Sequence, residues 1–187
     1  MTTLNAAFNA AQKPAPGEFT KAVKENRADV VKDLLQRGAD VNEKDDDGNA
    51  ALMWATCIGR EEIARLLIDQ GAILDEKNYG GRTALMWAAV YRCEGTVRLL
   101  LYRGASLDVK DNEGKTALKI IEYMGIPVIA QMLKDATAAE AAAKAEAERD
   151  SVLHDTAAER QTALRARAQK INVKPAQGRR SEGPHVG

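Results

Sequence analysis

The sequence predicts an all-α protein, a solenoid of stacked helix pairs with projecting turns, followed by a long C-terminal helix rich in Ala, Glu and Arg. Three observations lead to this fold class. First, Gly-Ala recurs at positions 38, 71 and 104, and leucine recurs at the same constant step at Leu34, Leu67, Leu100 and Leu133. Second, all eight aromatic residues lie before residue 124, so the compact core is expected there. Third, no Gly or Pro occurs between Pro127 and Pro175.

Each repeat unit is predicted to form a turn, a first helix and a second helix. In the third unit, Thr83 is a good N-cap residue, and residues 84–91 follow without Gly or Pro. Arg92 then occupies the place where two other units have glycine and where the first helix should end. The second helix has apolar residues at spacings of three and four and should stop at Gly104. The polar residues 105–115 form the next turn.

Two strings, DDDGNAALMWATCIGREEIARLLIDQGA at residues 45–72 and NYGGRTALMWAAVYRCEGTVRLLLYRGA at 78–105, resemble the ankyrin repeat. The resemblance covers about residues 16–136 and implies a helical solenoid that binds other proteins on its concave side. The family's Thr is replaced by Ala50 in the second unit, which should weaken that helix start by about 1 kcal/mol. The family's Pro is Ala in all of the units from the second onward.

The terminal units differ as end caps should, because only one of their faces meets a neighbour. The first unit has Lys21 and Glu25 where the second has Trp54 and Ile58, and the fourth has Lys134 in a leucine position. The predicted organisation comprises four segments: a flexible N-terminal segment 1–15, about four ankyrin-type repeats at 16–136, an extended charged helix at 137–173 and a disordered tail at 174–187.

The C-terminal helix is predicted from composition, with 12 Ala among mixed charges in residues 137–170. Two alternatives are open for this helix: it pairs with another helix, or it is a single helix surrounded by solvent. A coiled-coil seam would place Arg160 and Arg167 at two of its six core positions, which favours the single helix and a monomer.

Composition also limits the class of function. The 27 basic and 27 acidic residues give no net charge, which argues against nucleic acid as a partner. No apolar run approaches the ~18 residues of a membrane span, so we expect no membrane partner and a cytoplasmic protein. Cys57, Cys93 and two distant histidines make no familiar zinc spacing, and the repeat region has no histidine for catalysis. The sequence therefore predicts no enzyme activity, no cofactor and no metal.

An acidic string in the second unit imitates the first half of a calcium-binding loop. It runs through Glu43, Asp45, Asp47 and Gly48, but the position of the required bidentate Glu is Trp54. We interpret it as an ordinary acidic repeat turn.

A stripe of apolar residues along the first helices is the candidate binding surface. The stripe consists of Trp54, Ile58, Trp87, Tyr91, Ile120 and Met124, which recur as i, i+4 pairs in successive units. The two tryptophans have an alternative role as core residues that close gaps between first helices, whereas the resemblance places Ile58 and Tyr91 at the exposed end. With the turn tips, the predicted protein-binding residues are Trp54, Ile58, Tyr79, Arg82, Trp87, Tyr91, Asn112, Glu113, Tyr123 and Met124.

The predicted function is a non-enzymatic scaffold or adaptor that binds a partner protein through the concave helix face and the turn tips. The alternative is a structural or assembly subunit that docks into a larger complex through its C-terminal helix.

Overall fold

The computed structural model describes residues 14–171, with side chains described for residues 14–149 and for Thr162. The predicted flexible segment 1–15, apart from its last two residues, and the predicted tail 174–187 lie outside this range. The chain divides into two units, residues 1–139 and residues 140–187.

The described residues form helices and no named strand; one isolated bridge joins Lys44 and Ala50. The helices are α2 (Glu18–Lys24), α3 (Ala28–Gln36), α4 (Ala51–Cys57), α5 (Glu61–Asp69), α6 (Ala84–Val90), α7 (Glu94–Tyr102), α8 (Ala117–Met124) and α9 (Pro127–Ile171). The predicted fold class, an all-α repeat array with a long C-terminal helix, is confirmed.

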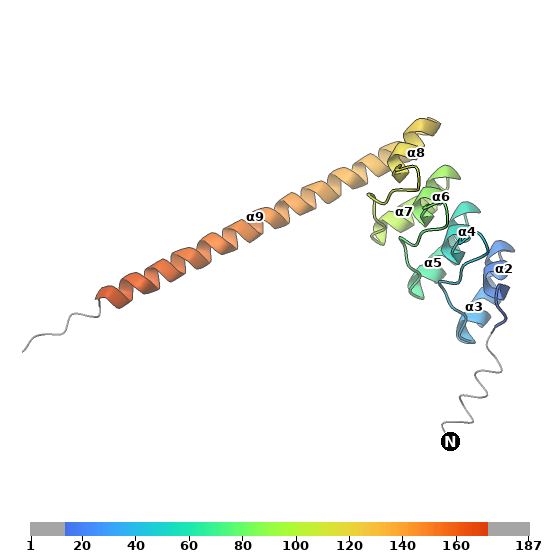
Figure 1. The fold of residues 1–187 in the computed structure, drawn as a ribbon, viewed down its shortest axis with the longest axis horizontal. Helices are drawn as coiled ribbons and strands as arrows, with labels where there is room; N and C mark the ends of the chain where they lie inside the picture. The colour runs from blue at the N-terminus through green and yellow to red at the C-terminus, as the bar shows by residue number, and fades with distance from the viewer. Residues whose placement is uncertain (1–13, 172–187) are drawn as a thin grey trace, which may run out of the picture. The chain divides into compact units, whose positions relative to one another are not determined.

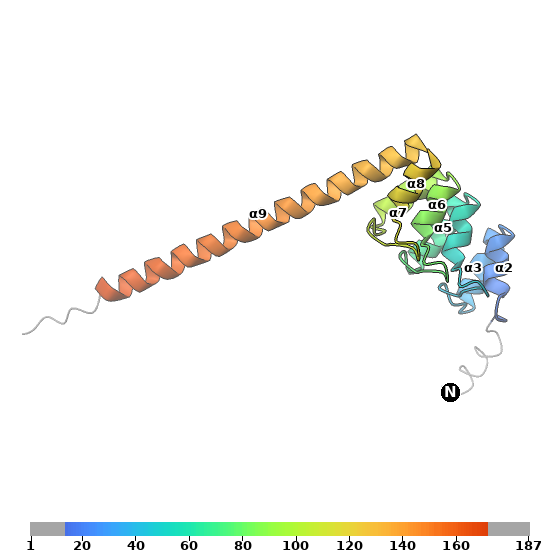
Figure 2. The same cartoon turned by 45° about the horizontal axis from the view of Figure 1, so that its top comes forward.

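Helices α2 to α8 stack in two rows (Figures 1 and 2). The first row contains α2, α4, α6 and α8, each in contact with the next, and the second row contains α3, α5 and α7. Ala55, Ala88 and Ala89 are fully buried on the first row, so small side chains bring these helices close together.

The repeated leucines form the core of the second helices. Leu34, Leu67, Leu100 and Leu133 all have 0 or 1% of their surface exposed. Burial of such a side chain contributes about 2 kcal/mol relative to leaving it in water. The repeat register read from the sequence therefore places equivalent residues in equivalent environments.

The recurring Gly-Ala pair has a backbone explanation. Gly71 ends α5 with φ of 87°, a left-handed conformation that glycine adopts without steric cost. The N–H of the following Ala72 then donates to the carbonyl of Leu67 at 3.0 Å, and the pairs after α3 and α7 repeat this bond. Gly-Ala marks the end of each second helix for this reason.

The first helices differ in how they begin. Thr83 and Thr116 accept bonds from the N–H groups three residues later, at 3.5 and 3.4 Å, whereas Ala50 offers α4 no side-chain cap. Tyr91, expected as the last residue of a first helix, is the C-cap of α6.

Helix α9 begins with Pro127, whose missing N–H costs nothing at a first helical position. Near its start, Ile129, Ala130 and Leu133 are buried against the repeat core. Residues 140–149 are exposed at every position. The predicted long C-terminal helix is thus present, and it begins inside the fourth unit of the array.

Candidate functional site

The three turns between units are held by one repeated device. The Oδ1 atom of Asp45 accepts hydrogen bonds from the backbone N–H groups two and four residues later, at 3.1 and 2.9 Å. Asn78 and Asp111, one and two repeat steps further along the chain, do the same at 2.9 to 3.0 Å. Either an aspartate or an asparagine therefore builds the turn, because only one side-chain oxygen is needed.

Neighbouring turns are joined to one another. The Asn78 side chain donates to Asn49 Oδ1 at 2.8 Å, and the Asn112 side chain donates to the Tyr79 carbonyl at 2.8 Å. The Tyr79 N–H also donates to the carbonyl of Asp47 at 3.3 Å. These bonds connect the tips of neighbouring turns into one continuous surface beside the first helices, which we call the ledge.

Tyr79 has a packing role that the sequence did not indicate. An ideal Cβ built on Gly48 would come within 2.7 Å of the Tyr79 ring, so the ring lies directly against that glycine. The residue as a whole is nevertheless 74% exposed. The outer part of the Tyr79 ring is thus open to solvent.

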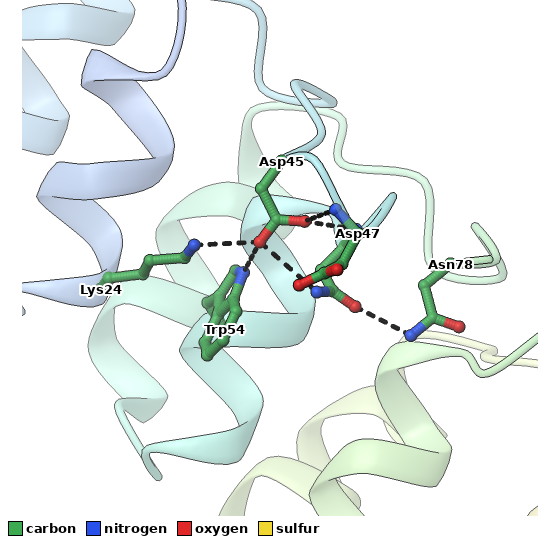
Figure 3. Close-up of polar contacts among 6 residues, drawn as sticks. Lys24, Asp45, Asp47, Trp54 and Asn78 are labelled. Carbon is green, nitrogen blue, oxygen red and sulfur yellow. Dashed lines mark hydrogen bonds and ion pairs between the residues drawn. The ribbon is translucent and has the colours of Figure 1, made fainter. Parts of the chain in front are cut away.

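An ionic cluster occupies the N-terminal end of the ledge (Figure 3). Asp45 Oδ2 accepts hydrogen bonds from Lys24 Nζ at 2.9 Å and from Trp54 Nε1 at 2.8 Å. The Lys24 ammonium also lies 4.2 Å from the centre of a Trp54 ring. Burial raises the pKa of Asp45, but the bonds from Lys24, Asn49 and Trp54 outweigh it and lower the pKa to about 2.

The aromatic part of the stripe is a connected cluster. The Trp54 and Trp87 rings meet edge to face at 5.4 Å, and the Trp87 and Tyr91 rings lie 5.8 Å apart. Both indoles are half-buried and pack against the core. The buried Trp87 Nε1 has no hydrogen-bond partner among the described residues. In the preceding unit the Asp45 carboxylate accepts the bond from Trp54, but the equivalent residue beside Trp87 is Asn78.

The exposed part of the stripe lies at the ends of the first helices. Ile58, Tyr91 and Met124 have 36, 54 and 42% of their surface exposed. Ile120, which takes the tryptophan position in the fourth unit, is buried. The stripe therefore presents a row of single apolar side chains beside the ledge of turns.

The C-terminal end of the ledge contains a pocket of about 230 Å³. It is lined by Arg82, Val90, Asp111, Glu113, Lys115, Ile120, Tyr123 and Met124. Four of these are among the residues predicted from the sequence to bind protein: Arg82, Glu113, Tyr123 and Met124. The structure brings these four together around one pocket, while Asn112 lies on the adjacent turn and bonds to Tyr79.

Charges around this pocket are partly neutralised. Lys115 Nζ lies 2.6 Å from Glu113 Oε2 and 5.4 Å from the centre of the Tyr123 ring. The hydrogen bond to Glu113 raises the pKa of Lys115. In the part of the chain with described side chains, the exposed Arg82 forms no ion pair.

Sequence reasoning missed Lys24, Asp45, Val90 and Asp111 as parts of the surface. A signal was available, since Lys24 and Val90 are two repeat steps apart, as are Asp45 and Asp111. The spacing does not reveal that Lys24 pairs with Asp45 while the equivalent Val90 leaves Asp111 without such a partner; this difference appears only in the structure.

The two cysteines lie close to one another at neighbouring units. Cys93 Sγ is 3.8 Å from the carbonyl oxygen of Cys57, and burial raises the pKa of both thiols. Neither thiol is activated as a nucleophile. Among residues with described side chains, no three His, Cys, Asp or Glu are grouped to hold a metal ion, and none of the described helices is apolar and long enough to cross a membrane.

Comparison with known proteins agrees with the repeat geometry. Residues 19–111 match the family model for ankyrin repeats, in three copies. A search of curated proteins found no match. Helix α8 packs against α6 of the matched residues, and Ile129 and Leu133 near the start of α9 belong to the same buried core. The part of the chain from residue 19 to residue 111 therefore belongs to the ankyrin repeat family.

Proposed function

We propose that this chain is a non-enzymatic adaptor that binds a partner protein through the stripe and the adjoining ledge of turns. Ankyrin repeats are protein-protein interaction modules, and the family is typically non-enzymatic. The observation that carries the proposal is the row of exposed apolar side chains at Ile58, Tyr91 and Met124 beside turns that are cross-linked by hydrogen bonds. Rigid surfaces with exposed aromatic and aliphatic groups bind at a low cost in conformational entropy.

All ten residues predicted from the sequence belong to this proposed surface. We assign the outer ring of Tyr79, the exposed ends of the stripe and the pocket to partner contact. The two tryptophans of the stripe are half-buried and expose only part of each indole. We also propose a monomer located in the cytoplasm.

The test combines a surface variant with a matched control. Replacing Ile58 and Tyr91 together by Ala should weaken partner binding at least about 10-fold, since hot-spot side chains commonly contribute over 1 kcal/mol each. The control is Tyr102→Ala, which removes an 86% exposed aromatic side chain from the second-row helix α7. Affinity purification with mass spectrometry identifies the partner, and titration calorimetry compares the variants.

Melting temperatures of the same samples complete the experiment. The double variant should melt close to the parent, because both side chains are exposed. Normal binding by the double variant, or equal loss in the Tyr102 control, would exclude the stripe as the interface.

The alternative assembly role rests on the exposed section of α9. Residues 140–149 have no buried position, so that this section is available for another contact. Loss of partner capture on deleting residues 140–187 alone would favour this role over the adaptor role.

A further inference from the structure

Two places in the array that are related by two repeat steps share a carboxylate but differ in what fills the space beside it. Asp45 corresponds to Asp111, Lys24 to Val90, and Trp54 to Ile120. At Asp45, the ammonium of Lys24 and the indole of Trp54 both donate to Oδ2. At Asp111, the corresponding side chains are aliphatic and cannot donate a hydrogen bond.

Asp111 accepts two hydrogen bonds, whereas Asp45 accepts five, from Lys24, Trp54, the Asn49 side chain and two backbone N–H groups. Its Oδ1 accepts from the backbone N–H groups of Glu113 and Lys115 at 3.0 and 2.9 Å. Among the side chains and backbone groups described, no donor reaches its Oδ2, although only 8% of the residue is exposed. The Oδ2 atom of this mostly buried residue is therefore free to accept a hydrogen bond, and a charged donor makes the stronger bond to a carboxylate.

The pocket beside Asp111 lies where Val90 and Ile120 stand in place of the Lys24 and Trp54 found beside Asp45. Its volume of about 230 Å³ is several times that of a water molecule. Val90, Ile120 and Met124 line it with apolar groups, which suit the methylene stem of a long side chain. The pocket thus combines an apolar wall with one nearly buried carboxylate.

We propose that this pocket receives a lysine side chain of the bound partner, whose ammonium pairs with Asp111 as Lys24 pairs with Asp45. The inference rests on the proposed function and names the chemistry of one anchor in the same interface. The chain itself shows which group the arrangement accepts, because Lys24 occupies the corresponding position two units earlier.

Two cations near the pocket modify this preference without reversing it. Lys115 pairs with Glu113 at 2.6 Å, which reduces its effect, but it also interacts with the charge of Asp111 and so competes in part with a second ammonium. Arg82 is exposed and is screened by solvent, and it weakens the site for a lysine. Removing the Arg82 charge should therefore strengthen lysine binding, whereas removing the Asp111 charge should weaken it.

The probe is a set of linear peptides selected from a random display library on the full immobilised chain. We expect the selected peptides to share a lysine, and replacing this lysine by norleucine should weaken binding about 10-fold, the loss of one charge-assisted hydrogen bond. Replacing the lysine by arginine tests whether the pocket prefers a compact ammonium or accepts any cation. We expect the arginine peptide to bind more weakly than the lysine peptide.

The matched protein variant is Asp111→Asn, because Asn78 shows that asparagine builds the same turn. Binding of the lysine peptide should fall about 10-fold in this variant, and the norleucine peptide should show no further loss. Tyr102→Ala is the control, since its exposed side chain lies on the second-row helix α7, outside the proposed surface. Arg82→Ala should bind the lysine peptide more tightly than the parent.

A second variant fills the pocket from within. Val90→Lys combined with Ile120→Trp copies the residues that surround Asp45, so the lysine peptide should no longer bind while the melting temperature is kept or rises. Peptides that bind this variant as they bind the parent would overturn the inference.

The outcomes separate the two proposals. Peptides that need Ile58 and Tyr91 but bind Asp111→Asn as tightly as the parent would overturn the lysine site and leave the proposed function standing. Peptides that bind independently of Ile58 and Tyr91, or the absence of any selected peptide, would overturn both.

Discussion

At the scale of single residues, comparison of equivalent repeat positions shows that the backbone of Arg92 is strained. The place after each first helix is Asn26, Gly59, Arg92 and Gly125, and all four have φ between 58 and 65°. For Arg92 this left-handed conformation brings Cβ too close to the backbone and costs about 1–2 kcal/mol.

Arg92→Gly should therefore stabilise the protein by about 1 kcal/mol, after part of the gain is lost to the greater freedom of glycine in the unfolded chain. Chemical denaturation of both proteins measures the difference. Gly125→Ala is the reverse control, because an added Cβ there meets no atom within 4 Å and the variant feels only the backbone strain. An Arg92→Gly protein no more stable than its parent would show that the side chain compensates for the strain.

A second residue-scale consequence concerns Asp45 and pH. Its pKa of about 2 in the folded protein lies below its ordinary value of 3.8, so the folded state favours the ionised form. The stabilisation is complete above the unfolded value and is lost as pH falls through the folded value. It amounts to about 2 kcal/mol, lost between about pH 5 and pH 2.

The measurement compares the parent with Asp45→Asn across this pH range. The free energy of unfolding of the parent should fall more steeply, and the difference between the two proteins should shrink as the carboxylate is protonated. A difference that stays constant with pH would mean that Lys24 and Trp54 contribute nothing through the charge of Asp45.

At the scale of the element, each second helix depends on one central leucine. Leu100 is fully buried in α7, so Leu100→Ala should destabilise the protein by about 2–5 kcal/mol through lost burial and the cavity left behind. Tyr102→Ala, on the same helix but 86% exposed, should change stability by less than about 0.5 kcal/mol. Thermal melts of both variants test this pair, and equal melting temperatures would contradict the register.

The elements show how much of the fold could be predicted from the sequence. The constant repeat step placed Leu100 in the core and Gly104 at a helix end, because local patterns determine both. The missing Thr at Ala50 correctly indicated a helix start without a side-chain cap. Period alone could not show that Lys24 meets Asp45 and Trp54, since this contact joins three separate elements.

The candidate site was less predictable for a related reason. The stripe was identified by its spacing, but Ile120 lies buried where the larger tryptophans remain half-exposed. The pocket lies where Val90 and Ile120 stand in place of a lysine and a tryptophan, while Asp111 matches the carboxylate of Asp45. Such a gap is a property of three residues together and has no signature in any one of them.

At the scale of the whole molecule, the repeat unit is stabilised by contacts with its immediate neighbours. Lys44 Nζ donates to the carbonyl of Lys77 at 3.1 Å, and Lys77 Nζ donates to the carbonyl of Lys110 at 2.9 Å. Each bond crosses a single junction between units, as expected for a quasi-one-dimensional array. The stability of the array is then approximately a sum over units and junctions.

The lysine bonds also give the array a direction. In each pair the ammonium comes from the unit nearer the N-terminus and the carbonyl from the next unit. Every junction of this type therefore offers the same donor on one side and the same acceptor on the other. For protein engineering, an extra copy of residues 45–77 inserted in register would meet a matching connector at both of its ends, so the chain is a natural starting point for lengthened arrays.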